Sequence, residues 1–283
     1  MDEVKKRADV LAEALPYIQK YDDKIVVVKY GGAAMLTEGA RDSVMRDIVL
    51  LNQIGVRIVL VHGGGPEISD TLKQLGKETR FIDGLRYTDA ETAEIACMVL
   101  AGKVNKSLVS LIHKAKGRAI GLCGVDDAML RVKKTDKADL GFVGDIVAVN
   151  VNAVRSALDG GLIPVIATVG VDENGQVYNI NADTAAAEVA AALGAEALIM
   201  MTDVRGLLRD KDDPDSLIPE ISADDIPGLV ASGVISGGML PKVDGLRAAI
   251  AHGLKEAVVI DGRVPHAILL ELLSDSGFGT LIK

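Results

Sequence analysis

Cysteine and aromatic residues are scarce in this sequence of 283 residues, which has two cysteines, no tryptophan, three phenylalanines and five tyrosines. Cys97 and Cys123 lie far apart and form no CxxC pair. Disulfide frameworks and thiolate metal sites are therefore poor interpretations, and a reducing compartment fits best. The segment through Lys24 lacks the apolar stretch of a signal peptide, and no run of about 18 apolar residues predicts a membrane span. We expect a cytoplasmic protein with no membrane partner.

Motifs of several enzyme classes are also missing. The sequence contains no GxxxxGK[ST], no GxGxxG, no HExxH and no GxSxG. These absences argue against P-loop nucleotide hydrolases, dinucleotide-dependent dehydrogenases, HExxH metalloenzymes and serine hydrolases. The four histidines, which show no metal-ligand spacing, are His62, His113, His252 and His266. We expect no metal ion held directly by protein side chains.

Basic residues are fewer than acidic ones: the sequence has 31 lysines and arginines and 40 aspartates and glutamates, for a net charge of -9. Nucleic acid is an unsuitable partner, since its binding depends on many neutralised phosphates. The 49% of hydrophobic residues indicate a folded globular chain, and the length suits one large or two modest domains. An anionic small ligand would need a few well-placed cations, because the overall field of the protein repels it.

Short β-branched runs alternate with segments of helical periodicity. This alternation predicts an α/β fold with a mainly parallel central sheet, and runs that are apolar throughout indicate strands covered on both faces. The expected strands are 25–28, 57–61, 146–149, 164–169, 197–201 and 257–260, and helices are expected over 40–55, 66–76, 89–101, 182–193 and 239–252. Residues 209–215, rich in aspartate and containing Pro214, predict a solvent loop.

Two local patterns predict further elements. Asn174-Gly175 lies between extended runs, and this dipeptide favours a hairpin turn because both residues tolerate positive φ. Residues 1–22 form a helix pattern with a narrow apolar stripe, suited to pairing with another helix or to packing on its own domain. Pro16 should kink this helix, because proline removes one backbone hydrogen bond. The stripe consists of Val4, Ala8, Leu11, Leu15 and Ile18.

Glycine-rich loops follow the first two expected strands. Lys29 ends the first strand and precedes Gly31 and Gly32, and the second strand runs into the His-Gly-Gly-Gly-Pro stretch of residues 62–66. Gly65 could cap the next helix with Pro66 in its first turn, leaving backbone N–H groups to bind an anion. Either loop alone could be a structural turn. Two such loops on adjacent strand ends indicate a phosphate-binding crevice instead.

Polar side chains alternate along Asn179, Asn181 and Asp183, so the strand period of two places them on one face. Asp183 could also cap the helix that follows, and the two roles are compatible.

A glycine pair at Gly237 and Gly238 opens a further helix that carries Lys242 in its first turn. A cation at that end opposes the helix dipole, which suggests an anion beside it, although a solvated surface lysine is the alternative. Two lysines at one site repel each other unless a carboxylate lies between them, and Asp183 is the obvious candidate. We expect a Lys29–Asp183–Lys242 cluster.

Arg86 follows a glycine just before the helix that begins near Asp89. Its guanidinium matches a carboxylate in bidentate fashion, which makes it the candidate for a substrate carboxylate. A structural salt bridge on the surface is the alternative.

Taken together, these segments resemble the amino acid kinase superfamily, and within it the branch that phosphorylates the side-chain carboxylate of N-acetyl-L-glutamate in arginine biosynthesis. The resemblance covers nearly the whole chain. HGGGP, GLRYTD and NINAD in this spacing are more specific to that branch than the lysine–glycine strand end is. The matching segments are KYGGAAM (29–35), VHGGGPEI (61–68), DGLRYTD (83–89), NINAD (179–183), TDVRGLL (202–208) and SGGMLPK (236–242).

The resemblance implies an αβα sandwich, with acetylglutamate bound by residues 23–194 and ATP, carrying Mg²⁺, by residues 195–283. By similarity, Lys29 and Lys242 would stabilise the transferring phosphoryl group, and Asp183 would orient both lysines. The implied substrate-binding residues are Gly64, Gly65, Arg86, Asn179 and Asn181, and the implied phosphate- or ATP-binding residues are Gly31, Gly32, Thr202, Asp203, Gly237, Gly238 and Met239.

The N-terminal helix and the C-terminal segment 266–280 resemble the arginine-inhibited members of that branch. There the N-terminal helix interlaces dimers into a hexamer, and some relatives bind a PII signalling protein. The likeness implies an L-arginine site in which Glu271 pairs with the guanidinium. The implied lining residues are Tyr17, His252, Glu271, Gly277 and Gly279.

Three other interpretations stay open at this point. The chain could be another superfamily kinase, acting on carbamate, aspartate, glutamate or a nucleoside monophosphate. It could be a regulatory arginine-binding protein without catalysis, which the presence of Lys29, Asp183 and Lys242 argues against. A dinucleotide-dependent dehydrogenase would need the missing GxGxxG.

Overall fold

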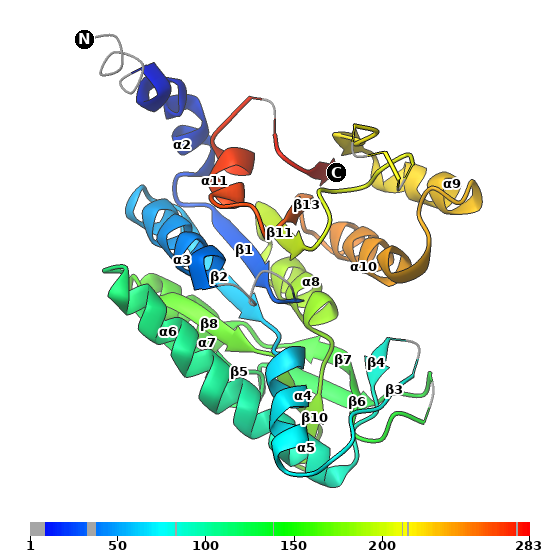
Figure 1. Ribbon diagram of the computed structural model, residues 1–283. Helices are drawn as coiled ribbons and strands as arrows, with labels where there is room; N and C mark the ends of the chain where they lie inside the picture. The colour runs from blue at the N-terminus through cyan, green and yellow to red at the C-terminus, as the bar shows by residue number, and fades with distance from the viewer. Residues whose placement is uncertain are drawn as a thin grey trace.

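An eight-stranded sheet runs through the middle of the computed structural model (Figure 1). The structure describes residues 9–32, 38–82, 84–137, 139–210, 212–213, 215–275 and 277–283. All strand pairs from β13 to β5 are parallel, whereas β14 runs antiparallel to β13. The spatial order is β12 (Glu220–Ile221), β14 (Thr280–Ile282), β13 (Glu256–Asp261), β11 (Ala197–Thr202), β1 (Ile25–Tyr30), β2 (Arg57–His62), β8 (Ile163–Ala167) and β5 (Ala119–Cys123).

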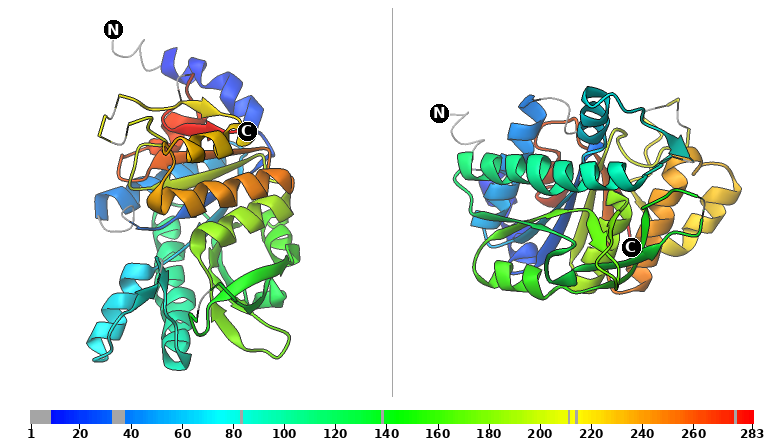
Figure 2. Two further views of the ribbon diagram at one scale, coloured as in Figure 1. Left: turned by 90° about the vertical axis from the view of Figure 1, so that its right-hand side faces the viewer. Right: turned by 90° about the horizontal axis from the view of Figure 1, so that it is seen from below.

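Helices cover both faces of this sheet, which confirms the predicted α/β sandwich (Figures 1 and 2). Successive side chains of β1 belong to the two hydrophobic cores on opposite faces of the sheet: Val26 and Val28 pack on one face and Val27 on the other. The first face carries α3 (Glu38–Gln53), α4 (Gly65–Gln74), α5 (Ala90–Cys97), α6 (Asn105–Lys114) and α11 (Ala267–Leu272). The second carries α7 (Asn152–Asp159), α8 (Ala182–Leu193), α9 (Ile226–Ala231) and α10 (Leu240–Ala251).

A second sheet corrects one expectation, because residues 146–149 do not join the central sheet. They belong to β7 (Gly144–Val149), which pairs antiparallel with β6 (Leu130–Lys134). The other two strands of this sheet, β9 (Val169–Val171) and β10 (Val177–Asn179), form the predicted hairpin. Its loop is longer than a two-residue turn, and only Gly175 of the Asn-Gly pair has positive φ. The Asp172 carboxylate closes the loop by accepting hydrogen bonds from two of its backbone N–H groups.

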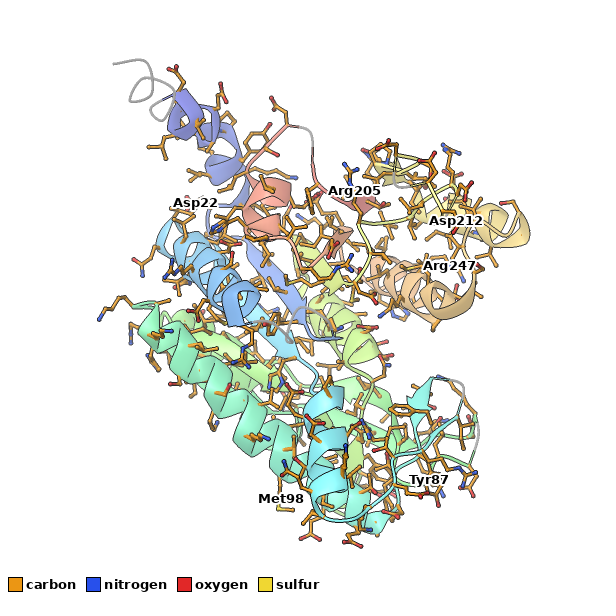
Figure 3. All side chains as sticks on the ribbon, viewed as in Figure 1. Asp22, Tyr87, Met98, Arg205, Asp212 and Arg247 are labelled. Atoms are coloured by element: carbon orange, nitrogen blue, oxygen red, sulfur yellow. The ribbon has the colours of Figure 1, made fainter. Side chains whose placement is uncertain are left out.

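Residues 90–114 form one long helical segment on the first face, in which α5 passes through a π-helical stretch, Met98–Val104, into α6. By length and apolar composition alone, this segment could cross a membrane, although no membrane span was expected from the sequence. A core helix of a globular protein passes the same test, and Leu100, Leu108 and Ile112 lie in the core beneath the sheet. Met98 points outward on the opposite side (Figure 3).

The described part of the N-terminal helix lies beside α11 (Figure 1). A turn at Ala14 separates the helical residues 9–13 from α2 (Leu15–Tyr21), close to Pro16, although the backbone of Ala14 stays in the right-handed helical region. Tyr21 is buried and donates a hydrogen bond to Glu256 at 2.8 Å, which joins α2 to β13. Leu11 and Leu15 of the predicted stripe are exposed. Val4 and Ala8 of the same stripe lie outside the described residues.

A two-stranded hairpin, β3 (Phe81–Ile82) and β4 (Leu85–Arg86), lies beside the second sheet (Figure 1). The backbone of Thr88, just after β4, exchanges hydrogen bonds with Leu140 and Phe142 in the connection between β6 and β7. The hairpin is thereby fixed next to the carboxyl ends of the central strands.

Candidate active site

The carboxyl ends of β1, β2 and β8 align in register, which brings the loops that follow them to one edge of the sheet. Lys29 pairs with Val61 across β1 and β2, and its side chain is buried, with 7% of the residue exposed. Its Nζ lies 2.8 Å from Oδ1 of Asp183. A Cβ at Gly31 would lie 3.3 Å from the same Nζ, so glycine leaves room for the ammonium group.

The second oxygen of Asp183 binds the ammonium group of Lys242, in the first turn of α10. The predicted cluster of two lysines around one carboxylate is therefore present. Burial by itself would raise the pKa of Asp183, but the charges of Lys29 and Lys242 outweigh burial and hold this pKa below its usual value. The carboxylate is ionised near neutral pH and neutralises much of the repulsion between the two ammonium groups.

Asn181, and not Asp183, caps α8, which corrects the alternative considered for Asp183. The strand β10 ends at Asn179, and the Asn181 side chain accepts hydrogen bonds from the backbone N–H groups of Asp183 and Thr184 at 2.9 and 3.1 Å. The Asp183 carboxylate is thereby free to face the lysines from the first helical turn.

The turn at residues 63–65 joins β2 to α4, and its N-cap is Gly64 rather than the expected Gly65, with Pro66 in the first helical turn. The Gly63 N–H donates to the Tyr30 carbonyl, which ties this turn to the end of β1. Gly64 presses against the π-helical stretch, because a Cβ there would lie 2.8 Å from Cδ2 of Leu100. Within the part of the chain that the structure describes, the N–H groups of Gly64 and Gly65 have no intramolecular acceptor.

Arg86 is buried, with 7% of the residue exposed, so it is not a surface salt bridge. One guanidinium nitrogen, Nη2, donates to the Gly65 carbonyl at 2.7 Å and to Oγ of Ser69 at 2.9 Å. The other, Nη1, is buried and has no hydrogen-bond partner among the described residues. The Arg86 guanidinium lies 4.9 Å from the ring centroid of Phe81. A buried cation with an unused donor suits a ligand carboxylate.

Two adjoining cavities connect Arg86 with Asp183 and Lys242. One, of about 150 Å³, is lined by Gly64, Gly65, Arg86, Asn179 and Asn181 among others. The other, of about 530 Å³, contains Asn181, Asp183, Gly238 and Lys242. The two share Gly84, Leu85, Val143, Ile180 and Asn181.

The larger cavity also contains residues that the sequence analysis did not single out. Thr135 donates to the Asp145 carboxylate at 2.9 Å, and Nζ of Lys137 lies 3.2 Å from it. All three line the wall formed by β6, β7 and their connection. Their surroundings in the sequence resemble an ordinary charged loop, so no local signal distinguished them.

The residues expected to bind nucleotide lie at several different strand and helix ends. Gly32 has positive φ after β1, Thr202 ends β11, and Asp203 follows it as an exposed residue. Gly237, Gly238 and Met239 form a short 3₁₀ turn before α10. Arg263 follows β13, and its Nε and Nη2 donate to the two oxygens of the Asp261 carboxylate at 2.9 and 2.7 Å. No local signal in the sequence pointed to this residue. Residues 33–35 of the first motif lie outside the described residues.

Most of the residues expected to bind arginine meet near α11. Oε2 of Glu271 accepts hydrogen bonds from the N–H groups of Phe278 and Gly279 at 2.6 and 2.9 Å, and Gly277 lies beside the same carboxylate. The Tyr17 hydroxyl donates to the Asp275 carboxylate. His252 is the exposed C-cap residue of α10. No group of three or more metal-ligating side chains lies together among the residues described.

Comparisons with known proteins identify the family of the chain. Residues 24–261 match the model of the amino acid kinase family. The chain is 51% identical over 278 residues to an acetylglutamate kinase of Clostridioides difficile, covering 98% of this chain and 97% of that one. It is also 51% identical to an acetylglutamate kinase of a Nostoc species, covering 98% of this chain and 93% of the relative.

Solved structures share the fold. An N-acetylglutamate synthase of Neisseria gonorrhoeae, complexed with coenzyme A and N-acetyl-glutamate, superposes with a TM-score of 0.84 at 26% identity. The alignment covers 97% of this chain, which spans 63% of the synthase chain. A carbamate kinase of Giardia superposes with a TM-score of 0.69 at 17% identity, covering 92% of this chain and 98% of that one, and this likeness shows the fold alone.

Proposed function

The chain belongs to the amino acid kinase family and is a phosphotransferase, and we propose that its acceptor is the side-chain carboxylate of N-acetyl-L-glutamate. The products would be ADP and N-acetyl-L-glutamyl 5-phosphate, an intermediate of arginine biosynthesis. The observation that carries this proposal is the unpartnered Nη1 of buried Arg86, in a cavity that adjoins the Lys29–Asp183–Lys242 cluster.

Substrate binding follows from the smaller cavity. The Arg86 guanidinium and the Asn179 amide would bind the α-carboxylate of acetylglutamate, with Asn181 nearby. Gly64 and Gly65 line the same cavity, and their N–H groups, which have no acceptor among the described residues, would bind the oxygens of the reacting carboxylate and phosphoryl group. Such a site holds both ends of a dicarboxylate-derived substrate in one orientation.

Phosphoryl transfer needs positioning and charge stabilisation rather than a covalent protein intermediate. A carboxylate oxygen of acetylglutamate would attack the γ-phosphorus of ATP while the bond to the bridging oxygen of ADP breaks. The attacking carboxylate, with a pKa of about 4.3, is already ionised near neutral pH, so no general base is needed. Lys29 and Lys242 would stabilise the negative charge on the transferring oxygens, and Asp183 would keep both lysines oriented.

The nucleotide would occupy the larger cavity and the strand ends beside it. Gly31, Gly32, Thr202, Asp203, Gly237, Gly238 and Met239 are the residues that we assign to its binding. Mg²⁺ would enter on the ATP phosphates and neutralise part of their charge. This fits the donor set, since both oxygens of Asp183 are already engaged by lysines and the described residues offer no cluster of metal ligands.

We also propose feedback inhibition by L-arginine, at a site lined by Tyr17, His252, Glu271, Gly277 and Gly279. The contact of Tyr17 with Asp275, in the loop that Glu271 closes, supports this assignment by coupling the N-terminal helix to that loop. The exposed apolar residues of this helix support a role in assembling a hexamer from dimers. A PII protein is a further proposed partner, and we place the reaction in the cytoplasm. The proposed lobes remain 23–194 and 195–283, preceded by the segment 1–22.

The decisive experiment measures ADP release by the purified chain with ATP and Mg²⁺, using N-acetyl-L-glutamate, carbamate, aspartate, glutamate and nucleoside monophosphates as acceptors. We expect turnover that depends on N-acetyl-L-glutamate. Preference for another acceptor would assign the chain to a different reaction of the family, and binding of arginine without any turnover would favour a regulatory protein.

A further inference from the structure

The turn between β2 and α4 is held by its carbonyl groups. Four successive carbonyls, at residues 62–65, each accept a hydrogen bond from a different donor. The donors to the carbonyls of 62, 63, 64 and 65 are, in that order, Oγ1 of Thr168 at 3.4 Å, Nδ1 of His62 at 2.8 Å, the Ile68 N–H at 3.0 Å and Nη2 of Arg86 at 2.7 Å. With the carbonyls directed into the protein, the N–H groups of Gly64 and Gly65 stay available to a ligand.

One of these donors, the His62 ring, is completely buried, with 0% of the residue exposed. Its Nε2 lies 3.2 Å from Nδ2 of Asn105, the first residue of α6. The Asn105 amide has a fixed orientation, because its oxygen accepts a bond from Nζ of Lys106 and its nitrogen also donates to the Val165 carbonyl. The Gly63 carbonyl can only accept, so the neutral ring must carry its proton on Nδ1. The unprotonated Nε2 then faces the amide nitrogen of Asn105, which also donates to the Leu122 carbonyl.

The surroundings keep the ring neutral. Burial lowers the pKa of His62 to about 4, and the positive charge of Lys106 on α6 adds to this effect, whereas the bond to the Gly63 carbonyl opposes it. A protonated Nε2 would also place an N–H group against the amino group of Asn105.

The fold makes room for this pair of side chains. The π-helical stretch Met98–Val104 immediately precedes Asn105. Two of its side chains, Leu100 and Val104, pack against Gly64. Gly121 on β5 has no side chain, and a Cβ there would lie 1.9 Å from Oδ1 of Asn105. The π-helical stretch therefore contacts the glycine turn, and the residue that directly follows it contacts the histidine that holds this turn.

We propose that His62 is a positioning residue for phosphoryl transfer, which holds the glycine turn through its Nδ1–H while its unprotonated Nε2 faces Asn105. This inference rests on the proposed function, because it assumes that the N–H groups of Gly64 and Gly65 bind the reacting groups. His62 itself touches neither substrate.

Two substitutions distinguish the role of Nδ1 of His62 from that of Nε2. His62→Asn retains a side-chain amide near the position of Nδ1, and His62→Gln retains one near the position of Nε2. We expect His62→Asn to keep kcat within about threefold of the unaltered enzyme, whereas His62→Gln and His62→Leu lose about tenfold or more, the factor expected for one hydrogen bond lost only from the reactive geometry. KM for ATP should change less than kcat.

His113 offers a matched control, because its Nδ1 also lies against a glycine carbonyl, that of Gly117, at the end of α6. His113→Leu should lower the unfolding midpoint without lowering kcat. If His62 had only a structural role, kcat of all these variants would follow their unfolding midpoints instead.

The tautomer itself can be measured in the unaltered protein, so the inference stays testable if a variant does not fold. Two-bond ¹⁵N–¹H correlation spectra of protein labelled at histidine should show His62 neutral at pH 7 with the proton on Nδ1. A proton on Nε2, or equal kcat for His62→Asn and His62→Gln, would overturn the inference. Absence of acetylglutamate-dependent turnover in the unaltered chain would contradict the proposed function instead, and the spectra would still report the tautomer.

Discussion

Lys29, near the end of the strand β1, and Asp183, in the first turn of the helix α8, form a buried ion pair of 2.8 Å. Lys242 reaches the second oxygen of the same carboxylate from a third element, α10. The pairing allows two cations to lie at one site without the full cost of their repulsion. It also leaves ammonium protons to bind a third anion, which is the requirement for stabilising a transferring phosphoryl group.

Removing the two lysines and removing Arg86 should have different kinetic effects. We expect Lys29→Ala and Lys242→Ala to lower kcat by about 100-fold or more, as for other losses of charge stabilisation in a transition state. Arg86→Ala should mainly raise KM for acetylglutamate, by about 10- to 100-fold, because it removes a charged hydrogen bond to bound substrate. Steady-state kinetics check this, with Lys255→Ala, from an exposed ion pair with Glu196, as the control. The reverse pattern would overturn these role assignments.

Asp183→Asn should be damaging although it preserves size. It leaves buried Lys29 and half-buried Lys242 without their common anion, so we expect a loss of about 3 kcal/mol in the free energy of unfolding together with a large fall in kcat. The pKa of Asp183 is below its usual value in the folded state, so its stabilisation is complete above about pH 4 and disappears as pH falls through the folded pKa.

Urea unfolding between pH 3 and 8 tests this prediction for Asp183. The control is Asp159→Asn, which removes an exposed partner of Arg57 and should cost less than about 1 kcal/mol. A loss for Asp183→Asn no larger than that of the control would refute a buried charge cluster.

Gly64→Ala should distort the glycine turn, because the new methyl group would lie 2.8 Å from Leu100 and 3.1 Å from Val104. Overpacking of this kind costs about 1–3 kcal/mol, and displacement of the turn should lower kcat as well. Gly245→Ala, on α10 with nothing within 4 Å of the new methyl, should instead stabilise the protein by up to about 1 kcal/mol. Thermal unfolding and kinetics of both variants provide the comparison. Equal effects at the two positions would mean that the contact with Leu100 is unimportant.

Asp47 on α3 is buried against His266, whose Nδ1 lies 2.6 Å from its carboxylate. Burial raises the pKa of Asp47 to about 6, although the bond to His266 opposes this shift. The folded protein therefore keeps a proton that the unfolded chain releases, so the contribution of Asp47 to stability falls as pH rises from about 4 to 6 and stays low above that. In Asp47→Asn, this pH-dependent decrease in the free energy of unfolding is absent. The free energy of unfolding of the variant minus that of the unaltered protein should therefore be larger at pH 7.5 than at pH 4.5.

The change in relative stability should be at most roughly 3 kcal/mol, the equivalent of two pKa units. Urea unfolding at the two pH values measures it. Asp42→Asn, on the same helix but bonded to Lys114 at the surface, is the control and should show little dependence on pH. A constant difference between Asp47→Asn and the unaltered protein at both pH values would contradict the raised pKa.

Deleting residues 1–20 tests the proposed regulation. The deletion removes the exposed Leu11 and Leu15 and the contact of Tyr17 with Asp275. We expect a smaller oligomer by light scattering and weaker inhibition by L-arginine, with catalysis retained. An intact hexamer mass together with undiminished inhibition would exclude the regulatory role of this helix.

Much of the fold could be predicted because its signals are local. Apolar runs such as 25–28 and 197–201 are buried strands, and Pro16 and Gly175 lie where the helix is interrupted and where the hairpin turns. Residues 146–149 form a strand as predicted, but they were wrongly expected in the central sheet, because a strand's composition does not specify its partner. The strands β5 and β14 and the π-helical stretch were not predicted, since they depend on neighbours distant in the sequence.

By itself the sequence determined which chemical groups the site contains, since a lysine at a strand end, glycines after strands and an acidic first helical turn follow from residue type and short-range geometry. Only the tertiary structure decided which of them meet. It assigned the helix cap to Asn181 and so freed Asp183 for the lysines, and it left one nitrogen of Arg86 unpaired inside a cavity. The physical reason is that backbone preferences act over a few residues, whereas ion pairing and burial depend on how strands and helices from distant parts of the chain are ordered around one sheet.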